Sequence, residues 1–172
     1  MITQVILYTD MIGNLSLSVP ATDGRQDFNA IALDTQNDVA IQLLGDELFN
    51  AFSSDLDAGG GTPTEQKWLD LLNGVTWTEV VDENDTEKDV IHNNDGIEKA
   101  WKYFVYRDYL NQLPFVSNFT GKAVNVNSNS APLDRQSLNI ETENRYNVGV
   151  DSYRTLIEFV KYYMDHKVDY TN

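Results

Sequence analysis

Residues 96–110 read GIEKAWKYFVYRDYL, and the spacing of their apolar side chains decides the fold. These side chains recur three and four positions apart along two lines, and a helix that is apolar on two faces is normally packed on both sides. One line holds Ile97, Trp101, Phe104 and Val105, and the other holds Tyr103, Tyr106 and Leu110. We therefore predict a central helix from Ile97 to about Leu113, ended by Pro114, in a mainly α-helical bundle of four to five helices.

The segment that follows this helix, residues 114–133, reads PFVSNFTGKAVNVNSNSAPL and has no helical period. Compact domains rarely contain a structureless loop of more than about 15 residues without a functional reason. We predict a long extended arm that contacts a neighbouring subunit; simple disorder is the alternative, because asparagine, serine and glycine are plentiful. The candidate oligomer-interface residues in the arm are Phe115, Phe119, Lys122, Val124, Val126 and Leu133.

After the arm, residues 134–168 return to a helical pattern. Apolar side chains lie three and four positions apart from Val150 to Met164, close to a heptad repeat. Gly149 lies inside this segment and is expected to mark a kink or a break. In that case residues 134–147 form a separate helical stretch before the last helix.

Before the central helix, residues 75–92 have the pattern of a β-hairpin. Residues 75–81 (VTWTEVV) are rich in β-branched and aromatic side chains, and the polar run 82–89 (DENDTEKD) follows. Such a pattern predicts two strands with a solvated tip. Trp77 is a further candidate oligomer-interface residue, although the pattern does not decide which way it faces.

The first half of the chain begins with residues 1–24, which we interpret as an irregular lead-in. From Asp27 the apolar residues fall at helical spacing, and Gly45 is well placed to end that helix. Asp46 can then cap a short second helix. We expect the whole chain, residues 1–172, to form one domain.

The sharpest helix start lies at residues 62–65, which read TPTE after three glycines. A threonine at the cap, a proline at the first helical position and a carboxylate three residues after the cap form a capping box. The box would satisfy backbone N–H groups at the helix start. We therefore predict a helix that begins here and ends near Gly74.

The charge of the chain is unusual. Twelve basic and 27 acidic side chains leave a formal charge of −15, and the basic residues are spread singly. Specific binding to DNA or to anionic lipid needs a basic patch, so neither is expected. Double-stranded DNA could pass such a protein without sticking. There is no cysteine, no basic leader and no stretch long enough to span a membrane.

A catalytic constellation is not evident. The two histidines, His92 and His166, suit surface or capping roles and have no metal-ligand spacing. The run 82–93 fails the EF-hand pattern, because Glu87 stands where glycine is required and Asn93 where a carboxylate is required. We predict no cofactor, no metal and no enzymatic activity; an enzyme with an unrecognised site is a further possibility.

Three stretches, in their order along the chain, carry a resemblance to a known family. They are LLGDELF at residues 43–49, TEQKWLDLLNG at residues 64–74 followed by the hairpin, and GIEKAWKYFVYRDYL at residues 96–110 followed by the arm and a last helix. This order, over roughly residues 27–168, resembles the head–tail connector (adaptor, head-completion or ring) proteins of tailed bacteriophages. The forms in phages of Bacteroidetes and in crAss-like phages are the most similar.

The resemblance implies a structural virion protein, assembled in the bacterial host cytoplasm, at the head–tail junction. It implies a homo-oligomeric ring, dodecameric to match a portal, that contacts the portal protein and other tail or ring proteins. The ring would extend the DNA channel and provide the tail docking surface, with double-stranded DNA passing without specific binding. The alternative function is a small acidic monomeric binding or inhibitor module that mimics nucleic acid.

Overall fold

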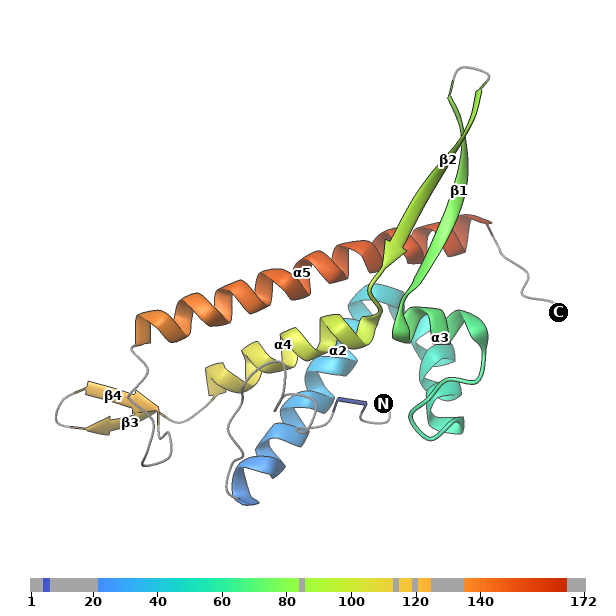
Figure 1. Cartoon of the computed structure of the whole chain (residues 1–172). Coiled ribbons are helices and arrows are strands. Elements are labelled where there is room, and N and C mark those ends of the chain that lie inside the picture. The colour runs from blue at the N-terminus through green and yellow to red at the C-terminus, as the bar shows by residue number, and fades with distance from the viewer. Residues whose placement is uncertain are drawn as a thin grey trace.

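A computed structural model describes residues 5–6, 22–83, 86–112, 115–118, 121–124 and 135–166 of the chain (Figure 1). Its elements, in order, are α2 (Thr22–Ala58), α3 (Gln66–Asn73), β1 (Val75–Glu83), β2 (Thr86–Asn94), α4 (Ile97–Gln112), β3 (Phe115–Asn118), β4 (Gly121–Val124) and α5 (Arg135–His166). The predicted fold class is confirmed, because the described residues form mainly helices with a small antiparallel hairpin, β1–β2.

Helix α4 is the central element, as its two apolar lines predict. It packs against α2, α3 and α5. Trp101 is fully buried, with its ring 6.3 Å from that of Phe52 on α2, and Tyr109 makes an edge contact with Phe28, also on α2. On the α5 side, the Phe104 ring lies 5.6 Å from the Tyr146 ring. The core is therefore built around both faces of one short helix.

Helix α2 bends at the predicted glycine. Gly45 has φ 70° and ψ 171°, which are not helical values, so α2 consists of two helical stretches joined by a kink at this residue. The predicted start at Asp27 is wrong, because α2 already begins at Thr22. In the lead-in, Ile6 is fully buried and its backbone N–H donates to Gln36 Oε1 over 2.9 Å. Residues assigned to an irregular segment thus contribute to the core.

The capping box predicted at residues 62–65 is wrong. Helix α3 begins at Gln66, and Glu65 at its cap position makes no side-chain capping bond. Asp55 supplies the acceptor instead: its Oδ2 accepts the backbone N–H groups of Thr64 and Glu65 over 2.8 and 3.1 Å, and its Oδ1 accepts the Thr64 hydroxyl. A carboxylate from the last turn of α2 therefore holds the turn that leads into α3.

The interruption expected at Gly149 is also wrong, since α5 runs as one helix from Arg135 to His166. A Cβ atom at Gly149 would lie 3.0 Å from Tyr103 Cβ and 3.1 Å from the Phe104 ring. The missing side chain therefore lets α5 cross close over α4. The predicted limits of this last helix, residues 134–168, are otherwise confirmed to within two residues.

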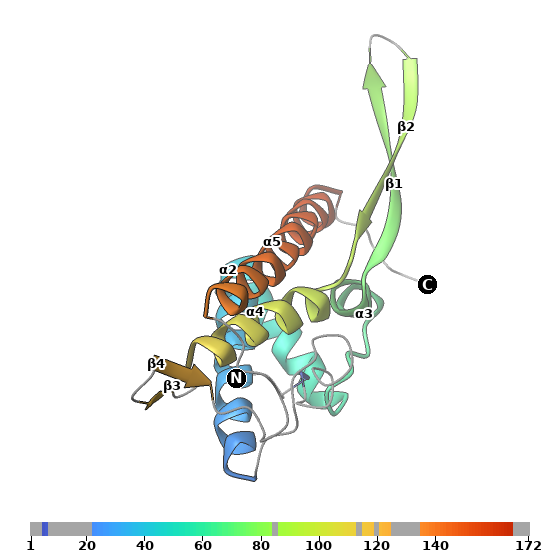
Figure 2. The same cartoon turned by 60° about the vertical axis from the view of Figure 1, so that its left-hand side comes forward.

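The arm is more regular than predicted. Within it, β3 and β4 pair as an antiparallel hairpin, from Phe115 opposite Val124 to Asn118 opposite Gly121. Both ends of α5 have a hairpin nearby: β3–β4 lies by its N-terminal end, and β1–β2 stands beside its C-terminal half (Figures 1 and 2). Among the described helices, none combines the length and the apolar character that crossing a membrane requires.

Candidate assembly surface on the β1–β2 hairpin

Two glycines, Gly74 and Gly96, lie in close backbone contact at the point where the hairpin β1–β2 joins the helical body. A Cβ atom at Gly74 would lie 2.6 Å from the Asn94 carbonyl oxygen, and one at Gly96 would lie 2.5 Å from that of Leu72. Both glycines have positive φ, 93° and 84°, which other residues adopt only with strain. Asn94 is buried and its Oδ1 accepts the Gly96 N–H over 2.8 Å. The first residue of β1 and the last residue of β2 are therefore held close together where the hairpin joins the helical body.

Beyond this root the two strands are paired without interruption over nine residue pairs, from Val75 opposite Asn94 to Glu83 opposite Thr86. Successive residues of a strand point to opposite faces, so the register defines two faces of the hairpin. The inner face consists of Val75, Trp77, Glu79 and Val81 with their partners Asn94, His92, Val90 and Lys88. The outer face consists of Thr76, Thr78 and Val80 with their partners Asn93, Ile91 and Asp89.

The inner face is held against α5 by an aromatic cluster. The Trp77 ring stacks on the His92 ring at 5.1 Å, and it contacts Phe159 at 5.4 Å and Tyr162 at 5.5 Å on α5. His92 Nε2 lies 3.0 Å from Glu79 Oε2. Trp77, predicted as an interface residue, therefore packs within its own chain, and His92 belongs to the same cluster.

The outer face is exposed along its described length, including two apolar side chains. Val80 is 60% exposed and Ile91 is 74% exposed. Val80 stands opposite Asp89 and Ile91 opposite Thr78, so the two are diagonal neighbours on one face, a separation across which side chains interact. The hairpin projects from the helical body (Figure 2), and because its outer face shows paired apolar side chains to water, it is a candidate contact surface.

Sequence analysis missed Val80 and Ile91 as candidates, although a signal was present. Two apolar doublets, Val80-Val81 and Val90-Ile91, stand in facing strands. Because adjacent residues of a strand face opposite ways, each doublet must place one apolar side chain on each face. Only one face can cover the chain's own helices, so the other must be exposed or bind a partner.

The strand β1 also has an unpaired edge. In the part of the chain that the structure describes, the sheet contains β1 and β2 alone, and β2 lies nearer to α5, which Trp77 of β1 also contacts. Exposed edge strands are normally protected by lysine, proline or a bulge. The sequence of β1, VTWTEVVDE, contains neither lysine nor proline, and its pairing with β2 is continuous. Its charged residues, Glu79, Asp82 and Glu83, are all acidic, so the edge is open to a strand that carries no carboxylates.

The hairpin is strongly acidic. Residues 75–94 contain six acidic side chains and one lysine, Lys88, which gives a formal charge of −5. The acidic residues are Glu79, Asp82, Glu83, Asp85, Glu87 and Asp89. Like charges at close range repel, so a partner for this hairpin must be neutral or basic where it makes contact.

The predicted interface residues of the arm are only partly described. Phe115 lies in β3, opposite Val124 in β4, and Lys122 lies in β4, opposite Ser117. Phe119, Val126 and Leu133 lie outside the described residues. Both views place β3–β4 at the opposite end of the molecule from β1–β2 (Figures 1 and 2). The structure therefore does not bring the described strands of the arm, β3 and β4, near the β1–β2 hairpin that carries Trp77.

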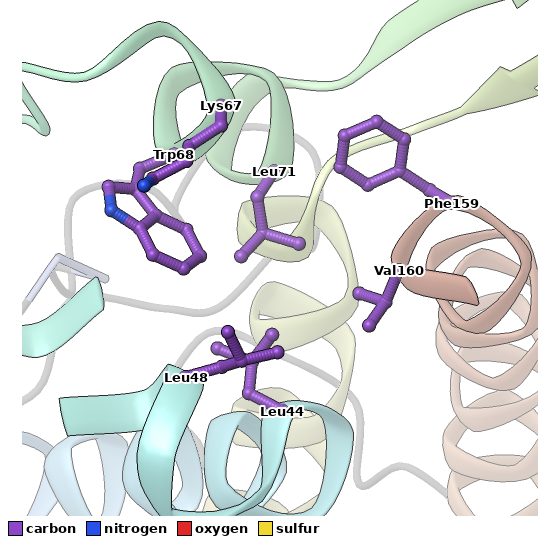
Figure 3. A pocket seen from close by; sticks show the side chains of 7 residues that line it. All are labelled: Leu44, Leu48, Lys67, Trp68, Leu71, Phe159 and Val160. Atoms are coloured by element: carbon purple, nitrogen blue, oxygen red, sulfur yellow. The ribbon is translucent and has the colours of Figure 1, made fainter. Parts of the chain in front are cut away.

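A small apolar cavity lies where α2, α3 and α5 meet (Figure 3). Its volume is about 10 Å³, far below the roughly 300 Å³ of small ligand pockets. It is lined by Leu44, Leu48, Lys67, Trp68, Leu71, Phe159 and Val160. Lys67 lies over the Trp68 ring at 4.9 Å and its Nζ is 2.6 Å from Glu65 Oε2. The cavity is a gap in the packing and not a ligand site.

The remaining polar contacts are structural. Arg107 lies over the Tyr146 ring and pairs with Asp108 at 2.6 Å, while Asp108 accepts the Thr35 hydroxyl. Burial raises the pKa of Tyr106 and of Tyr153, which keeps both phenols protonated at neutral pH. Within the described ranges, no three histidine or acidic side chains are grouped as a metal site would need.

No protein family, curated protein or solved structure matches this chain. Its function must therefore be argued from the hairpin, the charge and the order of elements along the sequence.

Proposed function

We propose that this chain is a non-enzymatic structural subunit of a homo-oligomeric ring in the head–tail connector of a tailed bacteriophage. The ring stands between the portal protein and the tail, extends the DNA channel and provides the tail docking surface. One observation carries the proposal: the β1–β2 hairpin, with Val80 and Ile91 exposed on its outer face, stands free of the helical body (Figure 1).

The energetics of the hairpin favour a partner. An isolated two-stranded hairpin is marginally stable in water, and here only the root and the inner face are supported by the chain itself. Burying a valine or isoleucine side chain stabilises by about 1.5–3 kcal/mol. A second protein that covers Val80 and Ile91 would therefore both gain affinity and fix the position of the hairpin.

The net negative charge of the chain is a second, independent argument for the same function. A ring subunit with a formal charge of −15 repels DNA phosphates along the walls of a channel, so DNA slides through it without being held. The resemblance described above, which covers residues 27–168, supplies the identity of the assembly. Neither argument requires a catalytic group.

Mass photometry of the purified chain, alone and mixed with a portal ring, tests this function. We expect a discrete ring on its own or a ring bound to the portal, with a stoichiometry that electron microscopy of the same sample can count. A chain that stays monomeric at high concentration and never joins the portal would overturn the proposal. If that monomer instead bound basic proteins tightly, its acidity would favour the nucleic-acid mimic.

A further inference from the structure

Two short sheets of this chain each have an open edge. In the described ranges, β1–β2 and β3–β4 are separate two-stranded sheets, and neither has a third strand. The edge of β1 has no proline or bulge, and its charged residues, Glu79, Asp82 and Glu83, are all acidic, so they disfavour an acidic strand but not one without carboxylates. The strand β4, Gly121–Val124, pairs with β3 on one side only. Each hairpin can therefore accept one more strand through its backbone N–H and C=O groups.

The two edges cannot meet within one molecule. The hairpins stand by opposite ends of α5 in both views (Figures 1 and 2). The 32 residues of α5 extend over about 48 Å at a rise of 1.5 Å per residue. Pairing of β1 with β4 therefore needs two copies of the chain. Because each copy would use two different surfaces, the contact is heterologous, and its repetition gives a ring where the rotation between copies closes.

Charge selects the arm as the partner of the hairpin. Residues 109–133 contain no aspartate or glutamate and one lysine, Lys122, and no other stretch of the chain is as long without a carboxylate. Residues 75–94, in contrast, carry a formal charge of −5. Most other surfaces of a second copy would bring carboxylates towards an acidic hairpin. The arm brings none, and it places its single cation on β4.

We propose that, in the ring, β1 of one copy accepts β4 of the next copy, so that the two hairpins join in a four-stranded intermolecular sheet. This inference rests on the proposed ring and names the segments that hold it together. Main-chain hydrogen bonds supply the affinity, and Val80, which lies in β1, gains cross-strand neighbours on the outer face from the added strand. The difference in charge between the two segments favours pairing of a hairpin with an arm over pairing of two hairpins.

Hydrogen–deuterium exchange of the full-length chain, as a monomer and in the assembled ring, tests the proposal. We expect alternate backbone amides of β1, and those of β4, to exchange more slowly in the ring than in the monomer. The amides of α4 serve as a reference, because their helical bonds are the same in both states. A ring in which β1 exchanges as fast as in the monomer overturns the inference but leaves the proposed function intact. Failure to form any ring overturns both.

The lack of cysteine in the chain allows a second, positional test. Thr76→Cys, Thr78→Cys and Val80→Cys are each mixed with Lys122→Cys and with Ala123→Cys under mild oxidation. Directly opposed residues of paired strands fall within the roughly 4.4–6.8 Å Cα separation of a disulfide. We expect at least one pair to form a mixed disulfide dimer, while Asn50→Cys, exposed on α2, forms none with either arm variant. If no pair links, or if the Asn50 control links equally well, the strand pairing is wrong.

Discussion

The central helix α4 and the hairpin β1–β2 are both rich in apolar and aromatic residues, but they differ in how much of that apolar surface is buried within the chain. Both apolar lines of α4 are covered by α2, α3 and α5, and Trp101 and Val105 are fully buried. The hairpin also carries apolar residues on two faces, but only its inner face is covered, by Phe159 and Tyr162. The core is thus completed within one molecule, whereas the outer face of the hairpin is left uncovered, and we propose that a second copy covers it.

This difference separates two kinds of mutational effect. Changes in α4 should lower the free energy of unfolding of the monomer. Changes on the outer face of the hairpin should leave the monomer folded and act on assembly alone. The following substitutions are ordered by their expected effect on monomer stability.

The largest effect is expected for Trp101→Ala. The Trp101 side chain is fully buried, with its ring near that of Phe52 on α2, and truncation of a buried tryptophan costs about 3–5 kcal/mol. Urea denaturation followed by circular dichroism measures this loss. The neighbouring Lys102→Ala, which removes a partly exposed ion pair with Glu98, should cost no more than about 1 kcal/mol. Equal losses for the two variants would contradict the central position of α4.

A smaller loss is expected for Gly149→Ala at the crossing of α5 over α4. The added methyl group would lie 3.0 Å from Tyr103 Cβ and 3.1 Å from the Phe104 ring, and such overpacking costs about 1–3 kcal/mol. Replacing glycine inside a helix offsets about 1 kcal/mol of that cost. We expect a lower melting temperature by calorimetry. The control Asn147→Ala, exposed on the same helix, should melt at or above the wild-type temperature.

The double variant Val80→Ser, Ile91→Ser should leave the monomer almost unchanged. Both side chains are exposed, and substitutions at such positions change the free energy of unfolding by about 0.5 kcal/mol or less. Assembly, measured by mass photometry, should be lost or strongly weakened, because the outer face no longer offers apolar surface. The matched control Thr76→Ser, on the same face, should assemble normally. A double variant that assembles like the wild type would remove the outer face from the interface.

The smallest effect concerns Asp55 and the pH dependence of stability. Although burial acts to raise the pKa of Asp55, its hydrogen bonds with Thr64 and Glu65 outweigh burial, and the pKa is lowered from its ordinary value of 3.8. Asp55 therefore stabilises the folded state above that pH, and this contribution is lost as the pH falls through the lower, folded-state value. Thermal melts in acid should show a shallower loss of stability for Asp55→Asn than for the wild type. Asp46→Asn, exposed on the same helix, is the control, and an equal change in both would show that Asp55 has no special role.

Much of the fold follows from local patterns. Helical spacing predicts α4 and α5 closely, Gly45 and Gly74 are found at the ends they predict, and the β-branched run at residues 75–81 predicts β1. The errors share one cause. The capping box failed because an acceptor on α2, Asp55, holds the turn before α3. A carboxylate seven residues before that box carries no local sign of its role.

The residues of the candidate contact surface were harder to predict from the sequence than the helices and strands. The hairpin was predicted, but the single residue chosen on it, Trp77, turned out to pack against α5 of its own chain. The doublets Val80-Val81 and Val90-Ile91 indicate that both faces carry apolar side chains. They do not indicate which face meets the helices, because that depends on Phe159 and Tyr162, more than 60 residues further along the chain.

The amino-acid sequence by itself therefore determined the helices, the hairpin, the acidic charge and the carboxylate-free arm, since each depends on neighbouring residues or on composition alone. Only the tertiary structure decided that Gly149 is a crossing point and not a kink, that Asp55 holds the turn before α3, and that Val80 and Ile91 are left exposed. These features arise where segments distant in sequence come into contact. Which side chains a contact covers is set by how the helices pack, and no local period records that.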